Sequence, residues 1–349
     1  MERRSSRKIR VGNMFIGGDS KISVQSMLNK PASDIEASVE QAIQLEKAGC
    51  EIIRAAVPDK EAVKLIEKLK KNVNVPIVAD IHFDYRLALG SLEAGVDKIR
   101  INPGNIGSDE RVREVAKACL QKGVPIRIGV NSGSLEKEIL AKHGAPTAQA
   151  LVESALHHAS LLEKYDFNDI VISIKSSNVQ TMVKAYELIA EKCDYPLHLG
   201  VTEAGTHNMA LIKSSIGIGS LLMRGIGDTI RVSMTDDPVK EVDAGFDILK
   251  AAGIKKDCPD LVSCPTCGRT KIDLISLATE VENRLRSCKK PIKVAVMGCA
   301  VNGPGEAREA DIGIAGGDGC ALIFKKGETV CKVPENEAVD RLMKEIENI

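Results

Sequence analysis

KIRINPGNIGSDERVREVAKACLQKGVPIRIG, residues 98–129, contains one complete strand–helix–strand unit. A short β-branched run, Lys98–Ile101, is followed by a helical pattern over Asp109–Lys122 and by a second run, Ile126–Gly129. Gly123 comes directly after the helical pattern, where glycine commonly ends a helix. Two strands joined by a crossover helix predict a parallel pair in one sheet.

The same unit repeats from about Ile22 to Lys250. A capping-box start at Ser33–Glu36 and a proline in the first turn at Pro238 mark two further helices. Eight such units are the number that closes a TIM (β/α)8 barrel. The eight predicted strands are Ile22–Gln25, Glu51–Arg54, Ile77–Asp80, Lys98–Ile101, Ile126–Gly129, Ile170–Ile174, Leu197–Val201 and Thr229–Val232.

The composition changes after about Lys255, where Cys258-Pro259 indicates a linker. We therefore predict a barrel domain at 1–256 and a second domain at 257–349. The pattern in the second domain predicts a small α+β fold, of the ferredoxin or sulfite-reductase-like kind. Its predicted elements are a helix at 273–286, strands at 292–297, 311–315 and 321–324, and a closing helix at 335–347.

The overall composition excludes several classes of partner. Lys plus Arg and Asp plus Glu both total 48 in 349 residues, so net charge indicates neither a nucleic-acid nor a membrane partner. Trp is absent and aromatics are 3%, which argues against base stacking. No apolar run approaches the roughly 20 residues of a membrane span. The basic start reads as a solvated lead-in to a hairpin without an apolar leader, and we predict a cytoplasmic protein.

Polar side chains gather at the predicted carboxyl ends of the strands, which is where TIM barrels place their active sites. Arginine forks match phosphate oxygens, so this set predicts a small polyanion such as a diphosphate as ligand. For any single arginine, an ion pair at the barrel rim is an equally good interpretation. The residues at these ends are Arg54, Asp80, His82, Arg100, Asn102, Arg127, Asn131, Lys175, Thr202, Glu203, Arg231 and Ser233.

Two cysteine motifs in the second domain predict a metal site. Cys264-Pro-Thr-Cys267 supplies two thiolates, and Gly298-Cys299-Ala-Val-Asn-Gly-Pro-Gly-Glu306 supplies a third. Sulfur ligands suit zinc or an iron–sulfur cluster rather than magnesium or calcium. Structural zinc needs a fourth ligand, for which Cys258, Cys288 and Cys320 are available. Spacing alone leaves zinc and an iron–sulfur cluster both open.

The whole chain resembles one family, the 4-hydroxy-3-methylbut-2-enyl diphosphate synthases of the methylerythritol phosphate route to isoprenoids, in their short two-domain bacterial form. The likeness rests on these runs together with the cysteine motifs: Val24-Gln-Ser-Met27, Asp80-Ile-His82, Arg100-Ile-Asn-Pro-Gly-Asn105, Arg127-Ile-Gly-Val-Asn131, Ser173-Ile-Lys-Ser-Ser177 and Gly200-Val-Thr-Glu-Ala-Gly205.

The resemblance implies a [4Fe-4S] cluster held by Cys264, Cys267, Cys299 and the Glu306 carboxylate. It implies 2-C-methyl-D-erythritol 2,4-cyclodiphosphate as substrate and a flavodoxin or ferredoxin as electron donor. A head-to-tail homodimer is implied as well, in which each barrel is capped by the partner's cluster domain. Within this frame Glu203 is the expected proton donor for the leaving hydroxyl, with Asp80 as the second choice.

Two other functions fit parts of the sequence. One is a zinc-stabilised, pterin-binding barrel transferase like dihydropteroate synthase, which would be colourless and contain zinc. The other is a non-catalytic iron–sulfur protein, which would not need a ring of arginines at the barrel mouth.

Overall fold

The computed structural model describes residues 2–300 and 307–349. The chain divides after Ala252 into two compact units, and each is described by itself. No helix among the described residues is long and apolar enough to cross a membrane.

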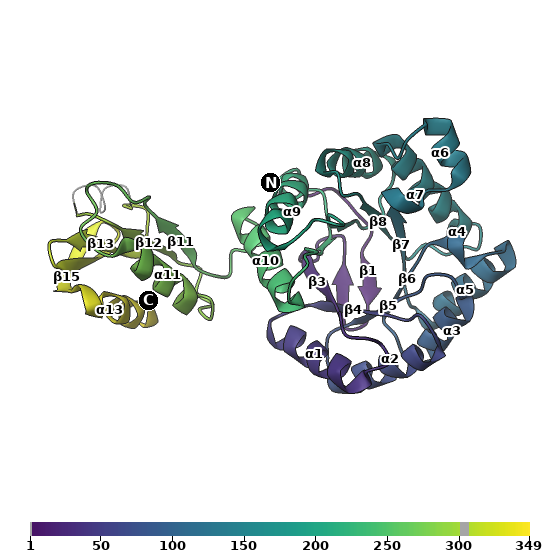
Figure 1. The fold of residues 1–349 in the computed structure, drawn as a ribbon, viewed down its shortest axis with the longest axis horizontal. Helices are drawn as coiled ribbons and strands as arrows, with labels where there is room; N and C mark the ends of the chain where they lie inside the picture. Colours follow the sequence, from purple (N-terminus) through teal and green to yellow (C-terminus); the bar gives the residue numbers. More distant parts are fainter. Residues whose placement is uncertain (1, 301–306) are drawn as a thin grey trace. The chain divides into compact units, whose positions relative to one another are not determined.

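The first unit is a barrel of parallel strands surrounded by helices (Figure 1). Its strands follow the order β8-β7-β6-β5-β4-β3-β10-β9. A bridge between Ile172 and Leu197 joins β8 to the start of β9 and closes the ring. All eight predicted strands are confirmed, with ends that differ by at most a few residues. They are β3 (Ser23–Met27), β4 (Ile52–Ala56), β5 (Ile77–Asp80), β6 (Lys98–Ile101), β7 (Ile126–Asn131), β8 (Ile170–Lys175), β9 (His198–Leu199) and β10 (Thr229–Ile230).

Helices cover the outer face of the barrel. Side-chain caps begin several of them: Asp34, rather than the predicted Ser33, accepts a hydrogen bond from the Ala37 amide and starts the first helix. Gly217 lies inside a helix, where a side chain would collide with Met182. The helices are α1 (Ile35–Lys47), α2 (Lys60–Asn72), α3 (Tyr85–Glu93), α4 (Pro103–Ile106), α5 (Asp109–Lys122), α6 (Lys137–His143), α7 (Ala148–Glu163), α8 (Val179–Lys192), α9 (His207–Leu222) and α10 (Pro238–Ala251).

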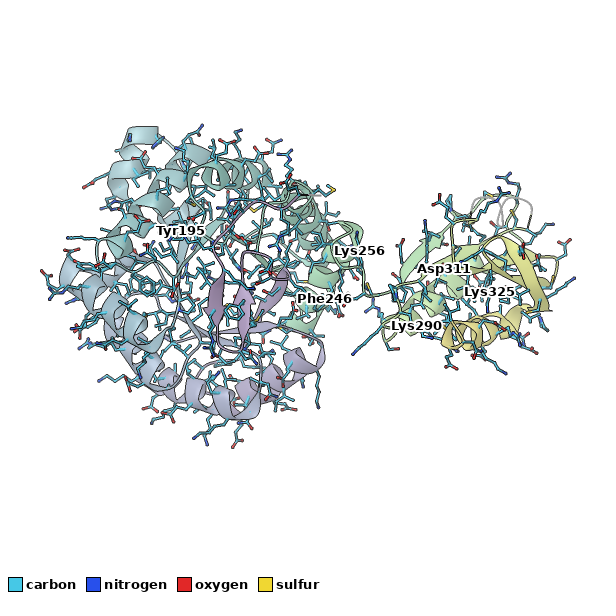
Figure 2. The ribbon with its side chains drawn as sticks, turned by 180° about the vertical axis from the view of Figure 1, so that it is seen from behind. Tyr195, Phe246, Lys256, Lys290, Asp311 and Lys325 are labelled. Carbon is cyan, nitrogen blue, oxygen red and sulfur yellow. The ribbon has the colours of Figure 1, made fainter. Side chains whose placement is uncertain are left out.

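A two-stranded hairpin, β1 (Ile9–Val11) and β2 (Met14–Ile16), forms the floor of the barrel. Its apolar side chains pack against Ile52, Val78 and Val171, which lie low on the barrel strands. The expectation of a solvated lead-in before the hairpin is wrong. Arg3 pairs with the buried Asp228 at 3.1 Å, and Arg7 stacks over the ring of Tyr195, which is labelled in Figure 2.

Over its described residues, 253–300 and 307–349, the second unit is a five-stranded mixed sheet with the α-helices α11 and α13. The strand order is β11-β12-β13-β14-β15, with parallel pairs at β11–β12–β13 and antiparallel pairs beyond. Two strands, the first and the last, were not predicted. The elements are β11 (Asp260–Ser263), α11 (Leu274–Leu285), β12 (Lys293–Met297), β13 (Ile312–Gly317), β14 (Cys320–Lys325), β15 (Glu328–Pro334) and α13 (Ala338–Glu347).

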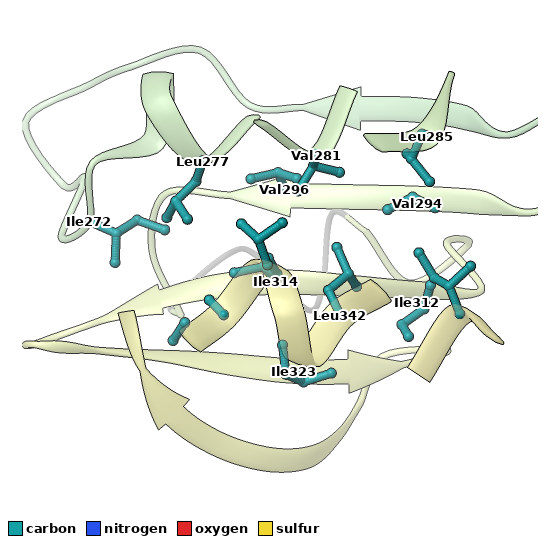
Figure 3. Close-up of a cluster of buried hydrophobic side chains, with 14 of the residues drawn as sticks. Ile272, Leu277, Val281, Leu285, Val294, Val296, Ile312, Ile314, Ile323 and Leu342 are labelled. Atoms are coloured by element: carbon teal, nitrogen blue, oxygen red, sulfur yellow. The ribbon is translucent and has the colours of Figure 1, made fainter. Parts of the chain in front are cut away.

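The core of this unit lies between the sheet and its helices. Val281 of α11 and Leu342 of α13 are completely buried in one apolar cluster with Val296, Ile314 and Ile323 of the sheet (Figure 3). Charged side chains make hydrogen bonds around this core. Lys290 donates to a carbonyl oxygen at the carboxyl end of α13, and Asp311 accepts a hydrogen bond from the Lys293 amide (Figure 2). The unit therefore has a core of its own, independent of the barrel.

Candidate active site

The cations predicted at the strand ends are buried inside the barrel. Side chains alternate along a strand, and these positions point inward rather than toward the helices. The side chains of Arg54, Arg100 and Arg231 are 11%, 12% and 14% exposed. Arg127 and Lys175 are buried further, at 1% and 8%. The five cations form one group inside the barrel, but the prediction that Arg127 ends its strand is wrong, because β7 continues to Asn131 and Arg127 is its second residue.

Asp80 is the carboxylate between two of these arginines. Its oxygens lie 3.6 Å from Arg54 Nε and 3.1 Å from Arg100 Nη1. Burial raises the pKa of Asp80, but Arg54, Arg100 and the nearby His82 outweigh it and lower the pKa to about 2. The side chain is therefore ionised near neutral pH. It is suited to orienting the two guanidinium groups and is not suited to donating a proton.

Glu241 of α10 is a second buried carboxylate, which the sequence analysis did not identify. It pairs with Arg231 at 3.4 Å and accepts hydrogen bonds from Ser26 Oγ at 3.0 Å and the Met234 amide at 3.1 Å. Met27 lies between arginines, since its sulfur accepts from Arg54 at 2.7 Å and from Arg231 at 3.6 Å. The sequence signal that could have identified Glu241 is its position among the apolar residues of the buried face of α10.

The positive charges of Arg127 and Lys175 are balanced less well by nearby carboxylates than those of the other three cations. Arg127 Nη1 donates across the barrel to Gln25 Oε1 at 3.3 Å. Burial, and then repulsion from neighbouring arginines, holds the pKa of both Arg127 and Lys175 well below the usual values. Burial in the same way lowers the pKa of Arg54 to about 10. Arg54 has Asp80 as its counter-charge at 3.6 Å, whereas Lys175 is surrounded, among the described residues, by cations only.

Two glycines keep space for these long side chains. A Cβ added at Gly129 would lie 2.4 Å from Arg100 Nε, and one at Gly200 would lie 3.6 Å from Lys175 Nζ and 2.9 Å from the Arg231 carbonyl oxygen. Glycine therefore allows the side chains to cross the strands closely.

The mouth carries a net positive charge. Five cations (Arg54, Arg100, Arg127, Lys175 and Arg231) face two carboxylates, Asp80 and Glu241, in a buried setting. Charges interact strongly where water is excluded, so this surplus favours an anion with several charges. Several guanidinium forks at one place favour an anion with several oxygens.

The remaining predicted residues follow the same strand ends but make fewer contacts. Glu203 is exposed, and its backbone has a φ of 51°, a left-handed conformation that is uncommon outside glycine and often accompanies functional sites. His82 is exposed beside Phe83. Asn102 is buried, and three others are half-buried: Asn131, Thr202 and Ser233.

The cysteine motifs meet at one edge of the small sheet. Cys264 follows β11 and Cys299 follows the adjacent parallel strand β12, so both lie at neighbouring strand ends. The Gly298 amide donates to Cys264 Sγ at 3.1 Å, and the Cys267 amide donates to Thr270 Oγ1 at 3.2 Å. Hydrogen bonds from Arg269 lower the pKa of the exposed Cys267 thiol, which favours the thiolate that binds metals.

Glu306, the predicted fourth ligand, lies outside the described residues. Within the described parts of the chain, no three His, Cys, Asp or Glu side chains are gathered closely enough to hold a single metal ion. The donor set nevertheless fits a thiolate-bound centre, because two thiols follow adjacent strands and the third lies on the same turn as Cys264.

Fold and site together define a two-domain barrel protein with buried cations at the barrel mouth and a cysteine site on its second domain. Two family models cover nearly the whole chain: the GcpE TIM-barrel domain matches residues 6–246, and the GcpE protein C-terminal domain matches residues 260–348. The chain belongs to the GcpE family.

Relatives over the full length carry one name, 4-hydroxy-3-methylbut-2-en-1-yl diphosphate synthase (flavodoxin). One from Clostridium perfringens is 61% identical over 349 residues and covers 100% of both chains. One from Caldanaerobacter subterraneus is 60% identical over 347 residues, or 99% of this chain and 98% of that one. One from Geobacillus thermodenitrificans is 55% identical and covers 100% of this chain and 93% of its own.

Solved structures of dihydropteroate synthases resemble the barrel. The Yersinia pestis protein aligns with a TM-score of 0.52 at 16% identity, over 71% of this chain and 100% of that chain. The Vibrio fischeri protein gives 0.53 at 16% identity, over 71% of this chain and 99% of its own. At such low identity the likeness shows the barrel fold alone.

Proposed function

We propose that this chain catalyses the reductive ring opening of 2-C-methyl-D-erythritol 2,4-cyclodiphosphate to 4-hydroxy-3-methylbut-2-enyl diphosphate in isoprenoid biosynthesis. Two electrons and two protons enter, a ring C–O bond to the diphosphate breaks, and one hydroxyl leaves as water. The observation that carries the proposal is the surplus of buried cations at the mouth of a GcpE-family barrel. A cyclic diphosphate is a compact polyanion of the kind that this surplus favours.

The arginines and Lys175 hold the diphosphate. Asp80 and Glu241 already fix the guanidinium planes of Arg54, Arg100 and Arg231, so these groups need little reorganisation when the anion enters. When the ring opens, charge develops on the released phosphate oxygen. The same preorganised cations stabilise that charge, and His82, Asn102, Asn131, Thr202 and Ser233 supply further polar contacts around the ligand.

Glu203 is the proposed proton donor for the leaving hydroxyl. It stands at the end of the seventh barrel strand on a strained backbone that fixes its position. Asp80 is not proposed as a donor, because the arginines keep it ionised. Asp80 instead positions Arg54 and Arg100.

The cysteine motifs hold the redox centre in this proposal. Cys264, Cys267, Cys299 and Glu306 would bind a [4Fe-4S] cluster, which supplies single electrons and a Lewis-acidic iron. A hard carboxylate is the weakest match for iron among these ligands, so Glu306 would be the most weakly held of the four. Flavodoxin, which the relatives' name includes, or a ferredoxin is the proposed electron donor. The proposed location is the cytoplasm.

The short linker between the two units supports the proposal of a homodimer. In a (β/α)8 barrel the helices end at the face opposite the mouth, so the chain leaves α10 at the foot of the barrel. The 14 residues of α10 rise about 21 Å. The segment Gly253–Pro259 spans about 25 Å when fully extended. Little length remains for reaching the chain's own mouth, so we propose that the cluster domain of a second copy serves it.

Complementation tests the dimer. Lys175→Ala and Glu306→Ala each inactivate a different half of a shared site, so mixed subunits regain activity while each variant alone has none. Mixtures that stay inactive, from a protein whose mass in solution is that of one chain, would contradict the dimer.

The function is tested by metal analysis and turnover on protein purified without oxygen. We expect brown protein with about four irons and four sulfides per chain. It should convert the cyclic diphosphate when reduced flavodoxin is supplied. A colourless protein with one zinc and no turnover would contradict the proposal and favour the barrel transferase.

A further inference from the structure

A lysine that the proposed reaction does not use lies deep in the barrel. Lys98, the first residue of β6, is completely buried, and its Nζ has no hydrogen-bond partner among the described residues. Other polar atoms of the barrel interior also lack a hydrogen-bond partner among the described residues. The buried polar atoms without a partner there are Ser23 Oγ, Gln25 Nε2, Lys98 Nζ, Arg127 Nε and His198 Nε2.

Donors outnumber acceptors among these atoms once Lys98 is charged. Arg127 Nε and Gln25 Nε2 can only donate hydrogen bonds, Ser23 Oγ and a neutral His198 can also accept, and an ammonium at Lys98 would add three more donors. A neutral amine adds a lone pair instead, which can accept a hydrogen bond. The hydrogen-bonding inventory of this layer therefore favours the uncharged form of Lys98.

The charges around Lys98 favour the same form. Burial lowers the pKa of Lys98 well below its usual value. Repulsion between an ammonium at this position and Arg127 and Arg54 lowers that pKa further. The one described carboxylate within electrostatic reach is Asp97. Its side chain is already bound to Lys70 Nζ at 2.6 Å and to the Ile77 amide at 2.8 Å.

The other charged groups of the interior do not offset this repulsion. Asp80 and Glu241 are paired with arginines of the mouth. His198 is held neutral, because burial and then Arg127 lower its pKa. The groups that face the interior are Arg54 from β4, Asp80 from β5, Arg100 from β6, Arg127 from β7, Lys175 from β8, His198 from β9, Arg231 beyond β10 and Glu241 from α10.

We propose that Lys98 is a neutral amine in the empty barrel and takes up a proton when a diphosphate occupies the mouth. The inference rests on the proposed function, since it requires an anion beside Arg127 and Arg54. Negative charge there offsets the repulsion that these arginines exert on Lys98. Lys98 thus couples anion binding to proton uptake without touching the ligand, which makes it a positioning residue rather than a catalytic one.

A pH dependence follows from this coupling. A group that gains a proton on binding strengthens binding as the pH falls, by up to about tenfold per pH unit for each proton taken up.

The test is calorimetric titration with inorganic pyrophosphate in two buffers of different ionisation enthalpy, at pH 7.5 and 8.5. The wild-type protein is compared with Lys98→Met, which has a similar length and no charge, and with Lys117→Met at an exposed position of α5. We expect Lys98→Met to take up about one proton fewer per chain than wild type and to bind with a flatter pH dependence. Lys117→Met should match wild type in both respects.

Stability provides the second readout. Replacing a neutral, unpartnered amine by a thioether should leave the melting temperature unchanged or raise it. Equal proton uptake in wild type and Lys98→Met would overturn the inference, as would failure of both Lys98→Met and Lys98→Gln to fold. If wild type binds neither pyrophosphate nor the cyclic diphosphate, the proposed function falls together with the inference. Binding with equal proton uptake overturns the inference alone.

Discussion

The barrel mouth and the cysteine loops differ in how the fold holds their side chains. At the mouth, buried carboxylates fix the arginines, and Asp80 is only 4% exposed between two of them. At the cysteine loops, Cys267 is exposed, and the described ties are hydrogen bonds to the turn and one amide on Cys264. The first site is preformed by packing and charge, whereas the second relies mainly on the turns of its backbone.

The chemistry of the two ligand sets explains the difference. Buried guanidinium groups repel one another and need counter-charges even when no ligand is present, so the fold must supply carboxylates. Protonated thiols are neutral and carry no such penalty, which leaves them tolerable on an exposed turn. A bound metal centre would then contribute to the order of its own loops. Substitutions at the two sites should therefore have separable effects.

The substitution with the largest expected effect is Cys267→Ser, which should remove the metal centre without changing the barrel mouth. Cys267→Ser replaces a soft sulfur ligand by a hydroxyl, so bound iron and turnover should both fall to background. Pyrophosphate binding should stay at the wild-type level, because the mouth belongs to the other compact unit. Iron analysis, turnover and calorimetry on the same preparation check this. Loss of pyrophosphate binding together with iron would contradict the independence of the two sites.

Asp80→Asn tests the preformed mouth through stability. The folded pKa of about 2 lies below the ordinary value of 3.8. The ionised carboxylate therefore stabilises the fold above about pH 4, and this stabilisation is lost as the pH falls toward 2. Removing one member of a buried charge cluster should lower the free energy of unfolding by about 3 kcal/mol at pH 7. Denaturant unfolding followed by circular dichroism at pH 7, 4 and 3 measures this.

Asp19→Asn is the matched control. Its partner Lys8 lies at 2.7 Å, but the Asp19 side chain is 82% exposed. Solvent screens an exposed pair, which therefore contributes little to stability, so this variant should unfold close to wild type. The difference between Asp80→Asn and wild type should also shrink at pH 3. A constant difference across the pH range would mean that Asp80 acts through shape rather than charge.

Gly129→Ala perturbs the mouth without removing a charge. The added Cβ would lie 2.4 Å from Arg100 Nε, so the flexible end of Arg100 must move away from Asp80 while the strand persists. We expect pyrophosphate affinity to fall by about tenfold, the size of one charge-assisted hydrogen bond. Gly133→Ala is the control, since nothing lies within 4 Å of its added Cβ. Equal affinities for the two variants would show that the position of Arg100 is unimportant for the anion.

The sequence identified the cations of the mouth but not the groups that hold them. Strand ends could be located because β-branched runs and helix caps are local signals, and each strand end carries its polar side chain with it. Glu241 pairs with Arg231 and Ser26, the latter 215 positions away in the chain, and no local pattern encodes that contact. Met27 stood inside a quoted motif, yet its contacts with Arg54 and Arg231 arise only when the ring closes.

Two strands of the small sheet were missed for a similar reason. Strand β15 has no completely buried residue, and its alternation toward the core is limited to the half-buried Cys331 and Val333, which is too short to predict a strand. Strand β11 has four residues, none of them fully buried. Both lie at the edges of the sheet, where pairing with a neighbour rather than burial defines the strand.

Met27→Leu is the mildest test of the comparison, because it leaves every charge of the mouth in place. The thioether sulfur accepts from Arg54 and Arg231, but sulfur is a weak acceptor, and both arginines keep their carboxylates. Leucine preserves the volume, so stability should change by less than about 1.5 kcal/mol. Pyrophosphate affinity should fall by only about twofold to threefold, since a weak hydrogen bond is lost.

Met14→Leu, on the barrel floor, applies the same change at the opposite end and should leave affinity unaltered. If Met27→Leu weakened binding as much as Gly129→Ala does, the thioether rather than the carboxylates would orient the arginines, and the mouth would depend on local contacts as the cysteine loops do.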